Sequence, residues 1–417
     1  MLSEEEETPA GERSAPPAPL AGLRIVEISS FVAAPLGGMT LAQLGADVVR
    51  VDPLGGAPDV RRWPVTAAGE SLYWAGLNKG KRSVTVDLRS TRGREVVARL
   101  AAAAGTVLTN APRPSYEELA RARPDLIHVG IEGHRDGRPA VDYTVNAEAG
   151  FPLATGPPSL REPVNHVLPA WDIACGLYAA IAILAADRHR ARTGQGRRLR
   201  IALADVALAT AGNLGLLGEA AVNGVERPRI GNHLYGGFAR DFATADDRRI
   251  MVVTLTARHF ADLAALTGRT EVFAGLERLL PADFTTDADR YRHRETIAAV
   301  IEPWFAERTL AAAVAALERT SVLWAPYRTF TEALSAAAGG PLLSEVDQPG
   351  IGRHPVPRSP IRDHADHADH ADGADDAGPP PAPAPVLGAD TTRVLRESGL
   401  TDAEIAGLRA EGVIGSR

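Results

Sequence analysis

The sequence contains very few cysteines and lysines and no long apolar run. These shortages already exclude several kinds of protein. A single cysteine, Cys175, rules out a disulfide framework and a thiolate metal cluster, and it favours a reducing cytoplasm. No stretch of 18 apolar residues is present, so we expect no membrane-spanning segment. Lysine occurs only as Lys79 and Lys81 among 43 arginines, a bias typical of a GC-rich genome.

The chain also lacks a strong net charge of either sign outside two short acidic segments. The formal net charge is −7, but the acidic excess is concentrated at residues 4–7 and 363–376, and the rest is nearly neutral. We therefore expect no nucleic-acid or membrane partner. Residues 1–19 contain several prolines and glutamates without an apolar core, which predicts a disordered tail.

Several well-known catalytic and binding motifs are missing. Residues 29–35, between the first predicted strand and helix, contain no G-x-G-x-x-G, which argues against a nicotinamide or flavin enzyme. Residues 75–82 lack the spacing and the Ser or Thr of a phosphate-binding P-loop. There is no G-x-S-x-G and no H-E-x-x-H, and we expect no metal site. Cys175 lies in an apolar helical pattern, which favours core packing.

What is present is an alternation of strand and helix patterns. Apolar strands are predicted at 23–28 and 47–51 around a helix at 34–44. Further strands are predicted at 83–88, 106–109 and 126–131, and further helices at 91–103, 116–122, 171–189 and 205–222. This alternation predicts an α/β fold with a Rossmann-like, doubly wound parallel sheet that binds ligands at the carboxyl ends of its strands.

The pattern changes at residue 224, which indicates a second domain. A strand pair is expected at 238–244 and 249–254, followed by short helices. We therefore predict a large domain at 20–223, a smaller α+β domain at 224–339, and a return to the large domain at 340–417. Residues 362–385 form a low-complexity loop, in which His-Ala-Asp triplets fit compositional drift better than a metal site.

One segment carries residues suited to catalysis. Asp172 falls in the first turn of the predicted helix, where the helix dipole keeps a carboxylate ionised at neutral pH. Such a carboxylate suits a nucleophile, although an ordinary capping role is the simpler interpretation. Gly176, four residues later on the same face, either leaves space for an acyl group or allows close backbone packing.

Several segments in the same order resemble the family III CoA-transferases, also called the CaiB/BaiF family, over residues 20–413. They are Leu23–Glu27, Leu44–Asp52, Asn78–Ser83, Asp172-x-x-x-Gly176, Thr193–Gly196 and Pro385–Gly388. Within the family, residues 31–56, 74–87, 164–173 and 324–328 are most similar to members that move CoA between the two carboxyl groups of 2-methylfumarate. The resemblance implies an interlocked homodimer and a nucleophilic Asp172 that forms an aspartyl-CoA thioester. It implies no permanent cofactor, because CoA enters as part of the substrate.

The resemblance also implies a set of CoA contacts. These are Val32, Ala33, Asn78, Lys79, Gly80, Lys81, Asn110, Ala111, Pro112 and Tyr143. The two lysines are expected to meet CoA phosphates, with a solvated-surface role as the alternative. His166 could assist Asp172 or be structural, and residues 231–237 could close the pocket. An arginine on the adenine side in formyl-CoA transferases of this family is replaced by Pro53.

Three other functions remain to be compared with intramolecular transfer. Racemases of the same fold need a His-Asp pair, but Val141 stands where the histidine would precede Asp142, which excludes that reaction. An intermolecular transfer of CoA between dicarboxylic acids would use Asp172 in the same way. A CoA-binding protein without catalysis is the remaining alternative.

Overall fold

A computed structural model describes residues 18–361 and 380–415, which form two compact units. The first unit contains residues 18–149, 167–213, 339–361 and 380–415, and the second contains residues 150–166 and 214–338. The His-Ala-Asp triplets and most of the predicted N-terminal tail lie outside the described residues.

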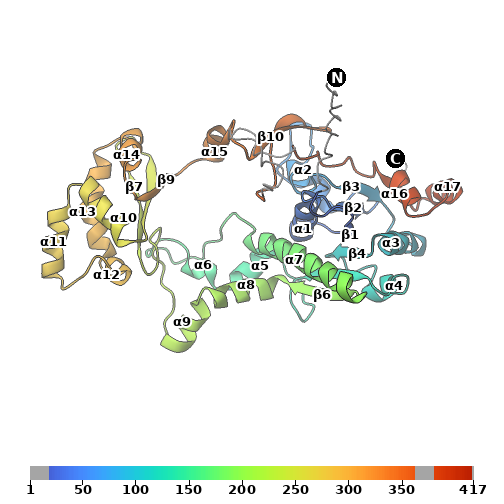
Figure 1. The fold of residues 1–417 in the computed structure, drawn as a ribbon, viewed down its shortest axis with the longest axis horizontal. Helices are drawn as coiled ribbons and strands as arrows, with labels where there is room; N and C mark the ends of the chain where they lie inside the picture. Colours follow the sequence, from blue (N-terminus) through green and yellow to red (C-terminus); the bar gives the residue numbers. More distant parts are fainter. Residues whose placement is uncertain (1–17, 362–379, 416–417) are drawn as a thin grey trace, which may run out of the picture. The chain divides into compact units, whose positions relative to one another are not determined.

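The first unit is built on a six-stranded parallel sheet with the order β3-β2-β1-β4-β5-β6 (Figure 1). Its strands are β1 (Arg24–Ile28), β2 (Asp47–Asp52), β3 (Arg82–Thr85), β4 (Thr106–Thr109), β5 (Ile127–Glu132) and β6 (Arg197–Ala202). The strand order reverses between β1 and β4, the position at which doubly wound sheets bind ligands. The predicted fold class is confirmed.

Helices cover both faces of this sheet. They are α1 (Ala33–Ala42), α2 (Leu72–Leu77), α3 (Thr91–Ala104), α4 (Tyr116–Ala120), α5 (Asp142–Glu148), α7 (Ala170–Thr193), α8 (Leu203–Asn213), α16 (Thr391–Glu397) and α17 (Asp402–Ala410). Val26 and Val49 pack in one core with residues of α3, α16 and α17. Because side chains alternate along a strand, Ile25 and Val48 point to the other face, where α1 contacts β1 and β2 and α7 contacts β5 and β6.

The long helix α7 passes through the middle of the first unit. By length and composition alone, α7 is long and apolar enough to cross a membrane. It is the only such helix in the part of the chain that the structure describes. Its contacts with α1, α5, α8, β5 and β6 are those of a core helix in a globular domain. A hairpin of β10 (Leu343–Gln348) and β11 (Gly352–Pro357) and a short 3-10 helix η1 (Pro58–Arg61) complete this unit.

The second unit combines an antiparallel sheet with a group of helices. The sheet contains β7 (Phe238–Ala243), β8 (Arg249–Thr254) and β9 (Leu323–Pro326) in that order. The helices are α6 (Phe151–Ala154), α9 (Leu216–Asn223), α10 (Ala257–Leu266), α11 (Thr270–Leu279), α12 (Asp287–Arg292), α13 (Arg294–Ala306), α14 (Leu310–Leu317) and α15 (Phe330–Ala337). Phe238, Phe242 and Phe305 lie in its apolar core.

Several features differ from the sequence-based expectation. The predicted helix at 205–222 is interrupted at Gly215, whose φ of 80° belongs to the left-handed region, so α8 and α9 are separate helices. Strand β6 is not among the predicted strands, because arginines alternate with its apolar residues and leave only a weak strand signal. Residues 150–166 belong to the second unit, which extends from residue 214 rather than 224.

Candidate active site

Asp172 lies in the first turn of α7, and α5 supplies the cap of that turn. Asp142 Oδ2 accepts hydrogen bonds from the backbone N–H groups of Trp171 and Asp172, at 2.7 and 3.2 Å. One turn further along α5, Asn146 Oδ1 accepts a hydrogen bond from Trp171 Nε1 at 3.1 Å. Because no side chain on α7 itself caps this helix, Asp142 satisfies N–H groups that would otherwise be unpaired. Sequence analysis missed this role, since 30 residues separate Asp142 from Asp172.

The same arrangement determines the acidity of Asp172. Burial, and after it the negative charge of Asp142, raise the pKa of its carboxyl group, and the positive charge of Arg62 lowers it; the net result is a pKa of about 6. At neutral pH the group is therefore mostly ionised, although burial and the charge of Asp142 keep its pKa above that of an exposed aspartate. A carboxylate that has lost much of its hydration is a better nucleophile than an exposed one.

Gly176 serves the packing of α7 against α1. A Cβ atom at Gly176 would lie 2.5 Å from the backbone oxygen of Ala33, and one at Gly37 would lie 2.8 Å from the backbone oxygen of Gly176. Real Cβ atoms do not approach oxygen so closely, so both helices need glycine at this crossing. Of the two roles predicted for Gly176, the structure shows close backbone packing, and the space is not available to an acyl group.

The loop between β1 and α1 is held at the carboxyl end of β4. Asn110 Oδ1 accepts a hydrogen bond from Ser30 N at 3.1 Å, and Asn110 Nδ2 donates one to Ser30 O at 2.8 Å. Phe31 follows with a φ of 65°, a conformation uncommon for a non-glycine residue. Val32 and Ala33 then begin α1 and are buried. Three predicted CoA contacts thus lie together at the reversal point of the sheet.

A fully buried cluster of charges lies behind this loop. Arg50 donates to Asp52 through Nε at 3.0 Å and to Asp59 through Nη2 at 2.9 Å. Its Nη1 group also donates to Asn78 Oδ1 at 3.1 Å. The sequence does not indicate a buried Arg50, because arginine is usually exposed. Its burial depends on hydrogen bonds and ion pairs with residues that only the fold brings together.

Lys81 belongs to the same cluster. Its Nζ group donates to Glu27 Oε1, Pro35 O and Asn78 Oδ1, at 2.9, 2.9 and 2.8 Å. An ammonium group has three N–H donors, so none remains for a phosphate. The prediction that the Lys81 side chain meets a CoA phosphate is therefore wrong.

Lys79 is also buried, and the structure shows it no carboxylate partner within the described residues. Its Nζ group donates to Gly76 O at 2.5 Å, and burial lowers its pKa to about 8. Gly80 follows with a φ of 75°, and its N–H group donates to Pro383 O. The side chains of Asn78, Lys79 and Lys81 all point into the protein, so any CoA contact from this segment is made by its backbone.

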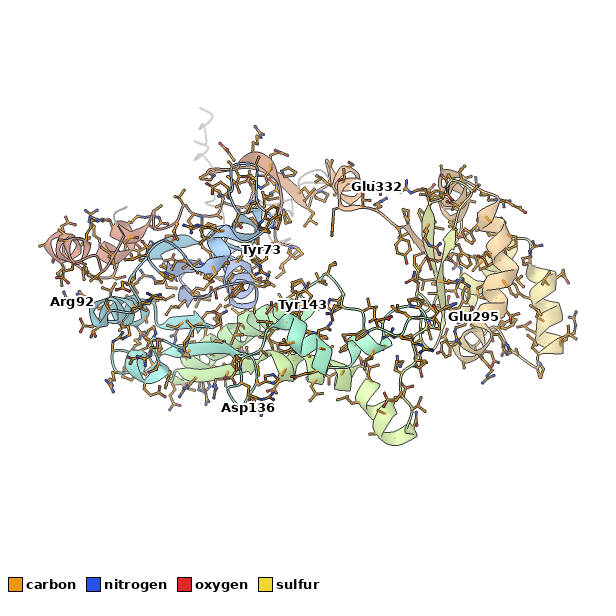
Figure 2. All side chains as sticks on the ribbon, turned by 180° about the vertical axis from the view of Figure 1, so that it is seen from behind. Tyr73, Arg92, Asp136, Tyr143, Glu295 and Glu332 are labelled. Atoms are coloured by element: carbon orange, nitrogen blue, oxygen red, sulfur yellow. The ribbon has the colours of Figure 1, made fainter. Side chains whose placement is uncertain are left out.

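The remaining predicted residues occupy different places. Ala111 N donates to Thr109 Oγ1 at 2.9 Å, and Pro112 follows in the loop after β4. Tyr143 is half-exposed on α5, next to the cap of α7 (Figure 2). His166 and residues 231–237 belong to the second unit, where Gly231 N donates to Gly156 O. Among residues 18–361 and 380–415, no group of acidic, histidine or cysteine side chains is arranged to hold a metal ion.

Comparison with known proteins gives a consistent assignment. Residues 20–391 match the model of CoA-transferase family III. The chain is 48% identical to a 2-methylfumaryl-CoA isomerase of Chloroflexus aurantiacus, over 95% of this chain and 97% of that protein. It is 26% identical to a succinyl-CoA:glutarate CoA-transferase of Mus musculus, over 91% of this chain and 86% of that protein.

The fold comparison agrees with the sequence comparison. A crystal structure of a CaiB/BaiF family protein from Brucella suis matches with a TM-score of 0.73 and 28% identity, over 92% of this chain and all of that chain. The predicted resemblance is confirmed, and the chain belongs to the family III CoA-transferases.

Proposed function

We propose that the protein interconverts the two CoA thioesters of 2-methylfumarate by moving CoA from one carboxyl group of the acid to the other. The observation that carries this proposal is the similarity to a 2-methylfumaryl-CoA isomerase over nearly the whole length of both chains. A buried, largely ionised Asp172 at the start of α7 supplies the group that such a reaction needs.

Asp172 starts the reaction as a nucleophile. One carboxylate oxygen attacks the thioester carbonyl, the carbon–sulfur bond breaks, and a mixed anhydride and CoA thiolate form. The thiolate then attacks the aspartyl carbonyl, which releases the diacid and leaves an aspartyl-CoA thioester. The other carboxylate of the diacid attacks this thioester, the carbon–sulfur bond breaks, and a second mixed anhydride and CoA thiolate form. The thiolate finally attacks the acyl carbon of the substrate in this anhydride and releases the aspartate. Asp172 is regenerated, and one thioester has replaced another.

In each step the residues of this chain are proposed to bind CoA, to keep Asp172 ionised and to exclude water. The backbone of residues 32–33, 78–81 and 110–112, together with Tyr143, is proposed to hold CoA at the carboxyl ends of β1 and β4. The N–H groups at the start of α7 favour the carboxylate of Asp172 over its protonated form. Exclusion of water protects the anhydride and the aspartyl thioester from hydrolysis.

The first test uses a single CoA isomer without any free acid. The wild-type enzyme is expected to produce the other isomer, as followed by chromatography, and Asp172→Asn should lose at least about a thousandfold in kcat because it removes the nucleophile. Asp187→Asn, the same substitution further along α7, is the control and should retain activity. An enzyme that needs added diacid would instead be an intermolecular CoA-transferase, and Asp172→Asn with a near-normal rate would overturn the mechanism.

We further propose that the enzyme acts as a cytoplasmic homodimer. Leu177, Tyr178 and Ile181 on α7 and Leu208 on α8 are exposed in the single chain, and together they give the first unit an apolar surface. A second copy of the chain is the partner that family membership implies for such a surface.

A further inference from the structure

Arg62 is an exposed arginine that contacts two aromatic rings, one of which, Phe31, lies in the loop that leads into α1. The first residue of α1, Ala33, meets α7 at Gly176, one turn after Asp172. The guanidinium carbon of Arg62 lies 5.4 Å from the ring centre of Phe31 and 5.2 Å from that of Tyr73. Figure 2 labels Tyr73 on α2. A guanidinium group between aromatic rings keeps its N–H edge available for a planar, two-oxygen partner.

The backbone around Arg62 is fixed from several sides. Arg62 O accepts a hydrogen bond from Ser71 Oγ at 2.6 Å, and the same oxygen atom of Ser71 caps α2 by accepting from Trp74 N at 3.0 Å. Arg62 N donates to Asp59 O at 3.2 Å, and the Asp59 side chain binds the buried Arg50. The backbone of Arg62 is therefore held in one position by hydrogen bonds that connect it to the buried charge cluster.

The charge of Arg62 acts on the site although no acid neutralises it. No carboxylate among residues 18–361 and 380–415 lies within 4.0 Å of its guanidinium group. Its positive charge nevertheless lowers the pKa of the carboxyl group of Asp172 and that of the Tyr73 hydroxyl, against burial that raises both. The first unit thus presents the carboxylate of Asp172 and a cation that contacts Tyr73 and Phe31 but pairs with no carboxylate in the part of the chain that the structure describes.

We propose that Arg62 binds the carboxylate of the substrate that Asp172 does not attack, and so selects thioesters of dicarboxylic acids. The inference rests on the proposed function and adds a specificity-determining residue to it. A carboxylate offers two oxygens in a plane, which match the two N–H groups on one edge of the guanidinium. After the first half of the reaction both carboxylates of the diacid are free, so Arg62 can release one and take the other.

The test compares two thioesters that differ in a single group. The probes are 2-methylfumaryl-CoA and tiglyl-CoA, in which a methyl group replaces the second carboxylate. Binding is measured by calorimetry in the Asp172→Asn background, where no turnover occurs. Arg62→Gln is expected to weaken binding of the diacid thioester by about tenfold or more, because a charge-assisted hydrogen bond is lost, and to change binding of tiglyl-CoA by less than about twofold. Arg61→Gln, the neighbouring arginine, should change neither.

The binding preference and the isomerisation reaction are measured separately, so each of the two proposals can fail on its own. Equal weakening of both thioesters would show that Arg62 only supports the loop, and no weakening of either would exclude it from the site; both results overturn the proposal. Retained binding of tiglyl-CoA shows that the variant is folded, and Arg62→Lys should keep part of the preference for the diacid. If the wild-type enzyme fails to interconvert the isomers while Arg62→Gln still loses the preference, the proposed function fails and the role of Arg62 stands.

Discussion

At the scale of single residues, the reactivity of Asp172 depends on a second aspartate that never enters the reaction. Asp142 accepts from the N–H groups that begin α7, and its charge adds to burial in raising the pKa of Asp172 to about 6. One side chain therefore caps the helix and adjusts the nucleophile. A neutral residue of the same shape can keep the first role without the second.

The first prediction uses this separation. In the proposed mechanism Asp172 attacks as a carboxylate, so kcat/KM should fall about tenfold per pH unit below pH 6 and level off above it. Asp142→Asn removes a negative charge but keeps an oxygen acceptor, so the inflection should move to lower pH. A pH profile of the variant measures the shift. Asp142→Ala, which also loses the cap, should lower stability by about 0.5–2 kcal/mol, as measured by urea unfolding. An inflection that moves to higher pH in Asp142→Asn would contradict this account.

The sequence predicts a nucleophile at Asp172, but it does not predict the side chains that contact and position this residue. Asp172 was predictable because a family motif and a helix start coincide there. Asp142, Arg50 and Arg62 were missed, since each acts through a partner that is distant in the sequence or through burial that composition does not reveal. Lys81 was predicted to meet phosphate, but the carboxylate of Glu27 holds it inside the protein.

At the scale of elements, the crossing of α1 and α7 determines the position of Asp172, the proposed nucleophile. The two glycines let the backbones meet, and α1 also carries Ala33, a predicted CoA contact, at its first residue. Any change that separates the two helices must therefore displace the nucleophile from the loop that follows β1.

The second prediction concerns Gly176→Ala. The added Cβ would meet Ala33 O at 2.5 Å, so the helices must separate, and we expect a loss of stability of about 1–3 kcal/mol together with a reduced kcat. Gly407→Ala in α17 is the control, because a Cβ there meets nothing within 4 Å and alanine favours the helix. Thermal unfolding and initial rates measure both effects. A stable, fully active Gly176→Ala variant would show that this crossing does not position Asp172.

The elements themselves were predictable where their patterns were regular. The predicted strand at 106–109 coincides with β4, and the predicted helix at 91–103 with α3, because a clear apolar period and a serine cap mark them. Strand β6 alternates between arginine and apolar residues at the sheet edge and gives a weak signal. β9 and the β10–β11 hairpin were also missed, since their pairing depends on distant or irregular partners.

At the scale of the whole molecule, the chain forms its first unit from three separate segments. The second unit is inserted between them, so α7 begins soon after the chain returns from residues 150–166. No pattern in the sequence indicates where such segments rejoin, which explains the differences at residues 150–166 and 214. The sequence nevertheless indicates two domains, because the pattern of apolar residues changes near residue 224.

The third prediction concerns the surface of α7. Ile181 is 61% exposed in the single chain, and Tyr178 and Leu177 are exposed beside it. If a second copy covers this face, Ile181→Glu should convert the dimer to monomers, as measured by light scattering during size-exclusion chromatography, because it buries a charge. Glu substituted at Val272, which is exposed on α11 of the second unit, is the control. A wild-type protein that elutes as a monomer would contradict the dimer.

The burial of both lysines has a chemical consequence beyond packing. CoA thioesters and acyl anhydrides modify exposed lysine amines without any catalyst, and this enzyme is proposed to generate such species repeatedly. The chain has only Lys79 and Lys81, each 4% exposed, and the amine of each is hydrogen-bonded inside the protein. Its surface therefore offers its own reactive intermediates no lysine to acylate, which protects the enzyme from damage during turnover.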